Sequence, residues 1–132
     1  MKYILDTNIC IYIIKKKPEQ VLKRLMKHHP TEIGISVITY FELIYGANKS
    51  QNPEKNNKAL KDFISAFDVL PWTESDADTA GRIRATLEKS GKTIGPFDLQ
   101  IAGQASANNL ILVTNNEKEF VRVKGLKIEN WT

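Results

Sequence analysis

The side chains of this sequence that could do chemistry together are carboxylates that stand far apart along the chain, namely Asp6, Glu42 and Asp98. Asp6 directly follows a short apolar run, where a predicted strand ends. Thr7 and Asn8, which come next, are good helix N-cap residues, so the following helix does not need Asp6 as its cap. Asp6 is therefore a candidate for chemistry, and a role as N-cap is the alternative.

Glu42 and Asp98 fall in predicted helices. The helix predicted over residues 37–45 is apolar nearly all round, which is typical of a buried helix, and an ionised Glu42 inside it needs a cation, a salt bridge or a polar strip of surface. Asp98 lies in the first turn of its helix, where the helix dipole alone favours an acid. Because Ile101 and Ala102, one turn further on, are apolar, Asp98 is expected at the inward edge of that helix.

Two further polar residues, Asn116 and Glu119, follow the clearest predicted strand. Taken singly, Asn116 belongs to an ordinary turn and Glu119 to an ordinary charged surface. Like Asp6, however, they follow a strand, and the carboxyl ends of parallel strands meet at the edge where ligands bind. We therefore expect Asp6, Glu42 and Asp98 to meet at one end of the sheet, with Asn116 or Glu119 nearby.

Such a cluster of acids is typical of a site for a hard metal ion. Carboxylates in one pocket repel each other and raise each other's pKa, so they are rarely gathered without a cation. Oxygen ligands without His or Cys favour Mg²⁺ or Mn²⁺ over zinc. The only cysteine is Cys10, and His28 and His29 are expected to be exposed on a polar helix end, where they make a poor metal pair.

A carboxylate-held Mg²⁺ in a basic protein indicates phosphodiester chemistry. The ion polarises the phosphate and lowers the pKa of a bound water. The net charge of +4 and the sequence pI of about 9.2 favour polyanionic partners. The sequence has no glycine-rich nucleotide-binding loop, so the phosphate must belong to a polymer or to a freely presented ester.

The elements that must position these residues alternate along the chain. Short apolar runs predict strands, and apolar stripes at helical spacing predict helices. Strands are predicted over residues 2–5, 32–36, 68–71, 110–114 and around 126–128, and helices over 9–14, 18–27, 37–45, 53–67, 74–89, 95–107 and around 119–120. This alternation predicts an α/β fold with a parallel sheet covered by helices on both faces.

The composition is that of an ordinary globular domain. The 132 residues are 42% hydrophobic and 26% charged, and a chain of this length can bury a sizeable core. No run approaches the roughly 18 apolar residues that a membrane helix requires, and the start of the chain does not read as a signal peptide. We expect a single domain over residues 1–132, no contact with membranes and a cytoplasmic location.

Four blocks of the sequence resemble, in order, the PIN-domain ribonucleases and more narrowly the VapC toxins of VapBC toxin–antitoxin systems. The blocks are Leu5-Asp6-Thr7-Asn8, the Ser36–Gly46 helix with Phe41-Glu42-Leu43 and Tyr45-Gly46-Ala47, Gly95-Pro96-Phe97-Asp98-Leu99-Gln100-Ile101-Ala102, and Val113-Thr114-Asn115-Asn116-Glu117-Lys118-Glu119-Phe120. The resemblance extends to the closing Glu129-Asn130-Trp131. It implies a PIN-like three-layer sandwich with a central parallel five-stranded sheet flanked by helices, as one PIN domain over residues 1–132.

The resemblance also implies an Mg²⁺- or Mn²⁺-dependent endoribonuclease with Asp6, Glu42 and Asp98 as its metal-binding and catalytic acids. Asn116 stands where many PIN domains have Asp, and a neutral amide is a weaker metal ligand. Glu119 matches a later acidic position and would act directly or through water. One firmly held ion is expected, with a second recruited with the substrate. Three side chains would orient the acids or waters, namely Thr7, Asn8 and Thr114.

The partners implied by the resemblance are RNA and a small VapB-like antitoxin whose tail covers the acidic pocket with a basic or apolar segment. A homodimer and a toxin–antitoxin hetero-oligomer are expected, with operator DNA contacted only through the antitoxin. Similar proteins are associated with cleavage of initiator tRNA in the anticodon loop. The candidates for holding the RNA stem are Lys15, Lys16, Lys17, Arg82, Arg84, Lys89 and Lys92.

Two other functions stay open. Transfer through an aspartyl phosphate, as in receiver or dehalogenase-like domains, would use Asp6, but Asp68 precedes rather than follows its strand and Asn8 stands where the dehalogenase pattern needs an acid. A non-catalytic PIN-like module that binds RNA or a partner is the second alternative. The presence of all three core acids disfavours it, and metal-dependent RNA cleavage separates the two cases.

Overall fold

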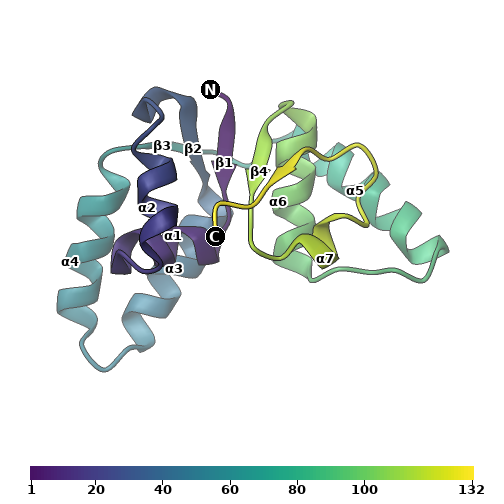
Figure 1. The fold of residues 1–132 in the computed structure, drawn as a ribbon. Helices are drawn as coiled ribbons and strands as arrows, with labels where there is room; N and C mark the ends of the chain where they lie inside the picture. Colours follow the sequence, from purple (N-terminus) through teal and green to yellow (C-terminus); the bar gives the residue numbers. More distant parts are fainter.

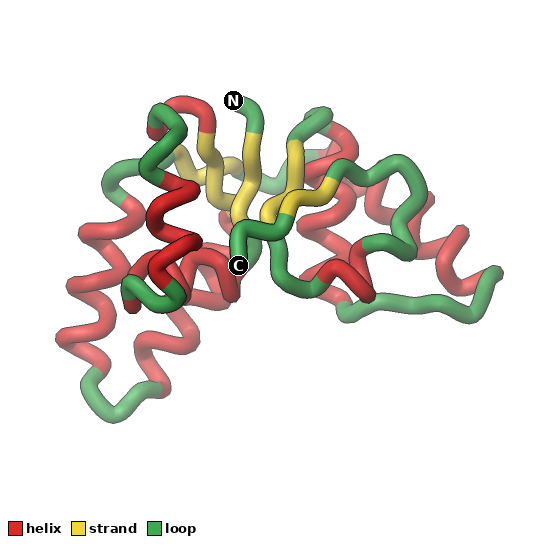
Figure 2. Tube along the Cα trace, in the orientation of Figure 1, coloured by secondary structure: helices red, strands yellow, loops and turns green.

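A computed structural model describes residues 1–132 and shows one five-stranded parallel sheet between two layers of helices (Figure 1). The strands are β1 (Tyr3–Leu5), β2 (Ile33–Ser36), β3 (Asp68–Leu70), β4 (Ile111–Val113) and β5 (Ile128–Glu129). The helices are α1 (Thr7–Lys15), α2 (Glu19–Leu25), α3 (Val37–Lys49), α4 (Pro53–Ile64), α5 (Glu74–Lys89), α6 (Pro96–Ala107) and α7 (Glu117–Phe120), with a 3₁₀ turn at Pro30–Glu32. The expected PIN-like sandwich is thus confirmed, and Figure 2 shows its strands in the middle with helices on either side.

The order of the strands is β3-β2-β1-β4-β5, and every neighbouring pair is parallel. The chain moves outward from β1 to β2 and β3, and then returns across the sheet to β4 on the other side of β1. This reversal makes the junction of β1 and β4 a topological switch point, and ligands of such sheets bind outside the carboxyl ends of the strands there. In Figure 1 the carboxyl ends share one edge, at which α1, α3 and α6 begin.

Alternation of side chains along β1 gives the sheet two cores. Tyr3 and Leu5 face the layer of α1 to α4, while Ile4 faces the layer of α5 to α7. All three side chains are buried, because β1 is central and both faces of the sheet are covered. None of the helices combines the length and the apolar character needed to cross a membrane.

Two predicted helix ends are wrong. α3 continues past Gly46 to Lys49, because a glycine inside a helix weakens it without ending it. α4 ends at Ile64 rather than at Phe67, because the chain turns there toward β3. Phe67 still packs against the core from that turn.

α3 is also not buried on all sides. Only Thr39, Leu43 and Ala47 are buried, and they form one face that packs toward the sheet. Phe41 and Tyr45 are 57% and 59% exposed. An apolar helix is buried all round only where neighbours surround it, and the packing of α3 against α1, α4, α6 and the sheet leaves Phe41 and Tyr45 largely exposed.

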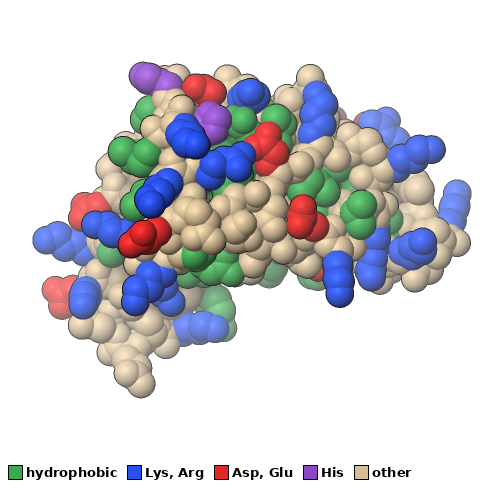
Figure 3. Space-filling model, viewed as in Figure 1, with side chains coloured by type: hydrophobic (Ala, Val, Ile, Leu, Met, Phe, Trp, Pro, Cys, Tyr) green, Lys and Arg blue, Asp and Glu red, His purple; other side chains and the backbone are tan.

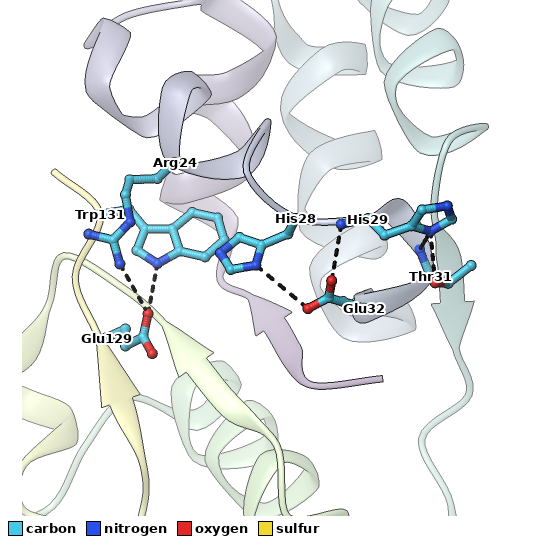
Figure 4. A network of polar contacts seen from close by, with 7 residues as sticks. All are labelled: Arg24, His28, His29, Thr31, Glu32, Glu129 and Trp131. Atoms are coloured by element: carbon cyan, nitrogen blue, oxygen red, sulfur yellow. Dashed lines mark hydrogen bonds and ion pairs between the residues drawn. The ribbon is translucent and has the colours of Figure 1, made fainter.

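The last residues close over the N-terminal half of the molecule (Figure 4). The indole of Trp131 is buried, and its Nε1 donates to Glu129 Oε1, which also accepts from Arg24. The expectation that His28 is exposed is wrong, because its ring stacks on Trp131 at 5.4 Å between ring centres and lies 4.7 Å from that of Tyr3. These contacts tie β5 and the C-terminus to α2 and β1.

Candidate active site

The structure brings Asp6, Glu42 and Asp98 together at the switch point of the sheet. They line one cavity of about 150 Å³, together with Thr7, Asn8, Ile101 and Asn116. Asp6 comes from the end of β1, Glu42 from α3 and Asp98 from the first turn of α6. Residues that stand 36 and more positions apart in the sequence thus share one polar pocket, as expected from the carboxyl-end rule.

Asp6 is held in place by the helix that it starts. Its Oδ1 accepts a hydrogen bond of 2.9 Å from the backbone N–H of Ile9, so Asp6 is the N-cap of α1 and the expectation that the helix does not need it as a cap is wrong. Burial raises the pKa of Asp6, while the Thr114 hydroxyl and the Ile9 N–H lower it and the charge of Glu42 raises it. Capping fixes the carboxylate at the edge of the cavity, where charge is costly.

Glu42 is oriented by a side chain of another helix. The hydroxyl of Thr7, in the first turn of α1, donates to Glu42 Oε1 at 2.8 Å. None of the salt bridges in the structure includes Glu42, Asp6 or Asp98. A salt bridge to Lys or Arg therefore does not explain the acid on α3, and the role expected for Thr7 as an orienting group agrees with its contact.

The pKa of Asp98 reflects the negative charge gathered in the cavity. Partial burial raises the pKa of Asp98 to about 6, and the charges of Glu119, Asp6 and Glu42 contribute to the rise. Carboxylates that affect each other in this way lie in one electrostatic environment without enough positive charge to balance them. This is the environment that a cation would stabilise.

Asn116 and Glu119 differ in their contacts with the cavity. Asn116 lines the cavity, whereas Glu119 lies beside it, in contact with Asp98. Glu119 Oε1 accepts from the backbone N–H of Gly95 at 2.8 Å, and Oε2 accepts from Asn116 Nδ2 at 2.6 Å. The Gly95 N–H lowers the pKa of Glu119 most strongly, so Glu119 is held as an anion against the start of α6.

The residues present fit a hard metal ion in type. The polar lining of the cavity is entirely oxygen- and amide-bearing, with no His or Cys, which is the donor set that Mg²⁺ and Mn²⁺ prefer. No three His, Cys, Asp or Glu side chains approach one another closely enough to enclose an ion directly as they lie here. Mg²⁺ usually keeps several waters when it binds carboxylates, and an open cavity leaves room for them.

A second concavity that the sequence did not reveal adjoins the acids. An apolar groove of about 310 Å³ runs between α1, α3 and α4, and Glu42 lines both the groove and the acid cavity. Ile11, Ile14 and Leu60 line its apolar floor, and Lys15 stands among its polar residues. The spacing of Ile11 and Ile14 on a helix whose other face is already apolar was the available signal.

The basic residues proposed to hold RNA divide into two groups. Arg82 and Arg84 form ion pairs on α5 with Asp78 and Glu88, at 3.1 and 3.7 Å. None of the salt bridges includes the lysines named with them. On the face seen in Figure 3, Lys and Arg side chains gather over both sides of the molecule and outnumber the acids. Lys and Arg therefore dominate the charged side chains of the face seen there, which suits a polyanion.

Known proteins resemble this chain over its whole length. The sequence matches the family model of the PIN domain over residues 3–126. It is 48% identical over 132 residues to the tRNA(fMet)-specific endonuclease VapC of Shigella flexneri, covering 100% of this chain and 99% of that protein. It is 45% identical over 131 residues to the protein of the same name from Salmonella typhimurium, covering 99% of this chain and 98% of that protein.

Solved structures with the same fold include chains of VapBC complexes. A chain of the DNA-bound VapBC complex from Salmonella typhimurium superposes with a TM-score of 0.95 at 45% identity, covering 100% of this chain and 99% of that one. A chain of VapBC2 from Rickettsia felis, bound to a fragment of promoter DNA, superposes with a TM-score of 0.93 at 40% identity, covering 100% of both chains. The chain therefore belongs to the PIN-domain family and, within it, to the VapC ribonucleases.

Proposed function

We propose that this protein is the toxin of a VapBC-type toxin–antitoxin system and that it hydrolyses a phosphodiester bond of RNA with the help of Mg²⁺ or Mn²⁺. The observation that carries the proposal is the meeting of Asp6, Glu42 and Asp98 in one cavity at the switch point, without a salt bridge to any of them. The relatives named as tRNA(fMet)-specific endonucleases make initiator tRNA the first substrate to test.

The residues of the cavity divide the work between them. A bound Mg²⁺ supplies a Lewis acid for the scissile phosphate and lowers the pKa of a water that it holds. Asp6, Glu42 and Asp98 provide the charges that hold the ion, and Thr7 keeps Glu42 turned toward the cavity. No His lines the cavity, so no imidazole is in place to activate a ribose 2′-OH. The expected products carry 5′-phosphate and 3′-hydroxyl ends.

The substrate fits the shape of the site. A cavity open at the surface reaches a phosphate of an unpaired loop more easily than one inside a duplex, because loop nucleotides are unstacked and can be splayed out. Exposed Lys and Arg side chains of the surface would bind the phosphates of the flanking stem without reading its sequence. A loop of folded RNA such as the anticodon loop of a tRNA meets both requirements.

The apolar groove beside Glu42 provides a place for a VapB-like antitoxin. A segment with apolar side chains would fill the groove between α1, α3 and α4, and an Arg or Lys at its end would reach the carboxylates. That positive charge would take the place of the metal ion and block the site. Contact with operator DNA would come through the antitoxin, and a homodimer of the toxin stays a prediction.

The test is cleavage of initiator tRNA by purified protein, with end-group analysis of the fragments. Asp6→Asn, Glu42→Gln and Asp98→Asn keep the side-chain volume and remove the charge, so each should abolish cleavage and growth arrest while the circular dichroism spectrum stays unchanged. Asp62→Asn, at an exposed acid of α4, is the matched control and should cleave normally. Cleavage that persists in chelator would contradict the proposal, and RNA binding without cleavage would indicate a non-catalytic module instead.

A further inference from the structure

Glu119 does not line the acid cavity, although it lies three residues after Asn116 and beside Asp98. Both of its carboxylate oxygens accept hydrogen bonds from groups that border the site, Oε1 from the Gly95 N–H and Oε2 from Asn116 Nδ2. Glu119 also lies beside Asp98, and its charge and a hydrogen bond between the two carboxyl groups raise the pKa of Asp98. The structure therefore points to an action through other residues.

The bond to Glu119 decides which end of the Asn116 amide faces the cavity. A carboxylate only accepts hydrogen bonds, so the amide nitrogen must point toward Glu119. The remaining polar atom of the side chain is Oδ1, and Asn116 lines the cavity with Asp6 and Asp98. The backbone of Asn116 is fixed as well, because its N–H donates to the buried Thr114 hydroxyl at 2.9 Å. The amide thus offers oxygen, not nitrogen, to the cavity.

We propose that Glu119 is a positioning residue that holds the Asn116 amide with Oδ1 toward the carboxylates and anchors Gly95 at the start of the helix that carries Asp98. The proposal rests on the function proposed above. An amide oxygen is a neutral ligand for a hard cation, and a carboxylate bonded to the amide nitrogen makes that oxygen more basic. Asn116 and Glu119 together then do the work that a single Asp would do at position 116.

Glu119→Gln is the first test, because it changes one atom and one charge. The new side chain can still accept from the Gly95 N–H through its oxygen, but it then presents an NH₂ group to the NH₂ of Asn116. Two donors repel, so the Asn116 amide turns over and directs nitrogen into the cavity. Mn²⁺ affinity, measured by calorimetry and electron paramagnetic resonance, should fall about 10- to 100-fold. The melting temperature in chelator should not fall.

The double variant Asn116→Asp/Glu119→Gln restores a hydrogen bond between positions 116 and 119 with donor and acceptor exchanged. The amide at position 119 donates to the carboxylate at position 116, which directs its other oxygen into the cavity. Mn²⁺ affinity should recover to near the wild-type value, with the single negative charge of the pair now at position 116 instead of 119. Asn116→Asp alone places two carboxylates within the 2.6 Å contact and should not reach the affinity of the double variant.

The orientation of the amide is measurable without metal. In chelator, the Asn116 side-chain N–H signals in nuclear magnetic resonance spectra should show a hydrogen-bonded proton in the wild type and lose it in Glu119→Gln. A double variant that binds Mn²⁺ as weakly as Glu119→Gln would overturn the proposal, because Glu119 would then act through its own charge. Unchanged Mn²⁺ affinity in Glu119→Gln would overturn it too, whereas wild-type protein that binds no Mn²⁺ would overturn the proposed function itself.

Discussion

Replacing Asp98 by Asn should stabilise the metal-free protein near neutral pH. Burial and the charges of Glu119, Asp6 and Glu42 raise the pKa of Asp98 from the ordinary 3.8 to about 6. A carboxyl whose pKa is higher in the folded than in the unfolded protein stabilises the fold while it holds its proton. That contribution is complete below the ordinary pKa and is lost as the pH rises through about 6. The neutral Asn side chain does not suffer this loss.

The size of the effect follows from the two pKa values. The difference between 3.8 and about 6 corresponds to at most about 3 kcal/mol, because one pH unit in pKa is worth about 1.4 kcal/mol. Asp98 is only half-buried, and screening by water reduces this to about 1 to 2 kcal/mol. For a domain of 132 residues, such a gain raises the melting temperature by about 4 to 7 °C.

The assay is a series of thermal melts in chelator at pH 4, 6 and 7.5. Asp98→Asn should melt above the wild type at pH 7.5, and the gap should close toward pH 4. Asp62→Asn, which removes an exposed acid from α4, controls for the change in net charge and should shift little at any pH. Adding millimolar Mn²⁺ should raise the melting temperature of the wild type more than that of Asp98→Asn. The reason is that a ligand that binds only the folded state stabilises most the protein that binds it most tightly.

Two results would refute this reasoning. Equal melting temperatures for the wild type and Asp98→Asn at pH 7.5 in chelator would mean that the carboxylates do not strain the fold. A gain that is as large at pH 4 as at pH 7.5 would mean that the substitution stabilises through packing or hydrogen bonding, not through charge.

Three further substitutions test single contacts. Thr7→Val keeps the shape but removes the hydroxyl that donates to Glu42, so kcat for RNA cleavage should fall about 10-fold while Thr7→Ser retains activity. Trp131→Ala leaves a cavity beneath the C-terminus and should lower the free energy of unfolding in urea by about 3 to 5 kcal/mol. Gly103→Ala would bring a Cβ to 2.5 Å from that of Ala80, where α5 packs on α6. This overpacking should lower the free energy of unfolding by about 1 to 3 kcal/mol, and with it the melting temperature.

The meeting of the acids was predictable because it depends on local sequence and one general rule. Asp6 directly follows an apolar run and Asn116 comes three residues after another, and parallel strands bring such positions to a common edge. The alternation of strands and helices likewise shows in residue periodicity. The order of the strands does not, because short apolar runs of similar composition carry no signal for which of them become neighbours.

The errors concern residues whose surroundings come from distant parts of the chain. His28 is covered by Trp131, which lies more than a hundred positions away, so its helix alone gave no sign of burial. Thr7 was a plausible cap for α1, but its hydroxyl is used by Glu42 from another helix, and the capping falls to Asp6. The contacts of Glu119 were equally hidden, because they depend on how the loop before α6 meets the turn after β4.

The position of β1 in the sheet has a consequence for the order in which the molecule forms during its synthesis. β1 is made first, but one of its two neighbours, β4, spans residues 111–113. Until then one edge of β1 is open, and Asp6 has neither Asp98 nor Asn116 beside it. At about 5 to 20 residues per second, this interval lasts roughly 5 to 20 seconds. A ribosome thus carries a chain without a complete cavity for most of its translation.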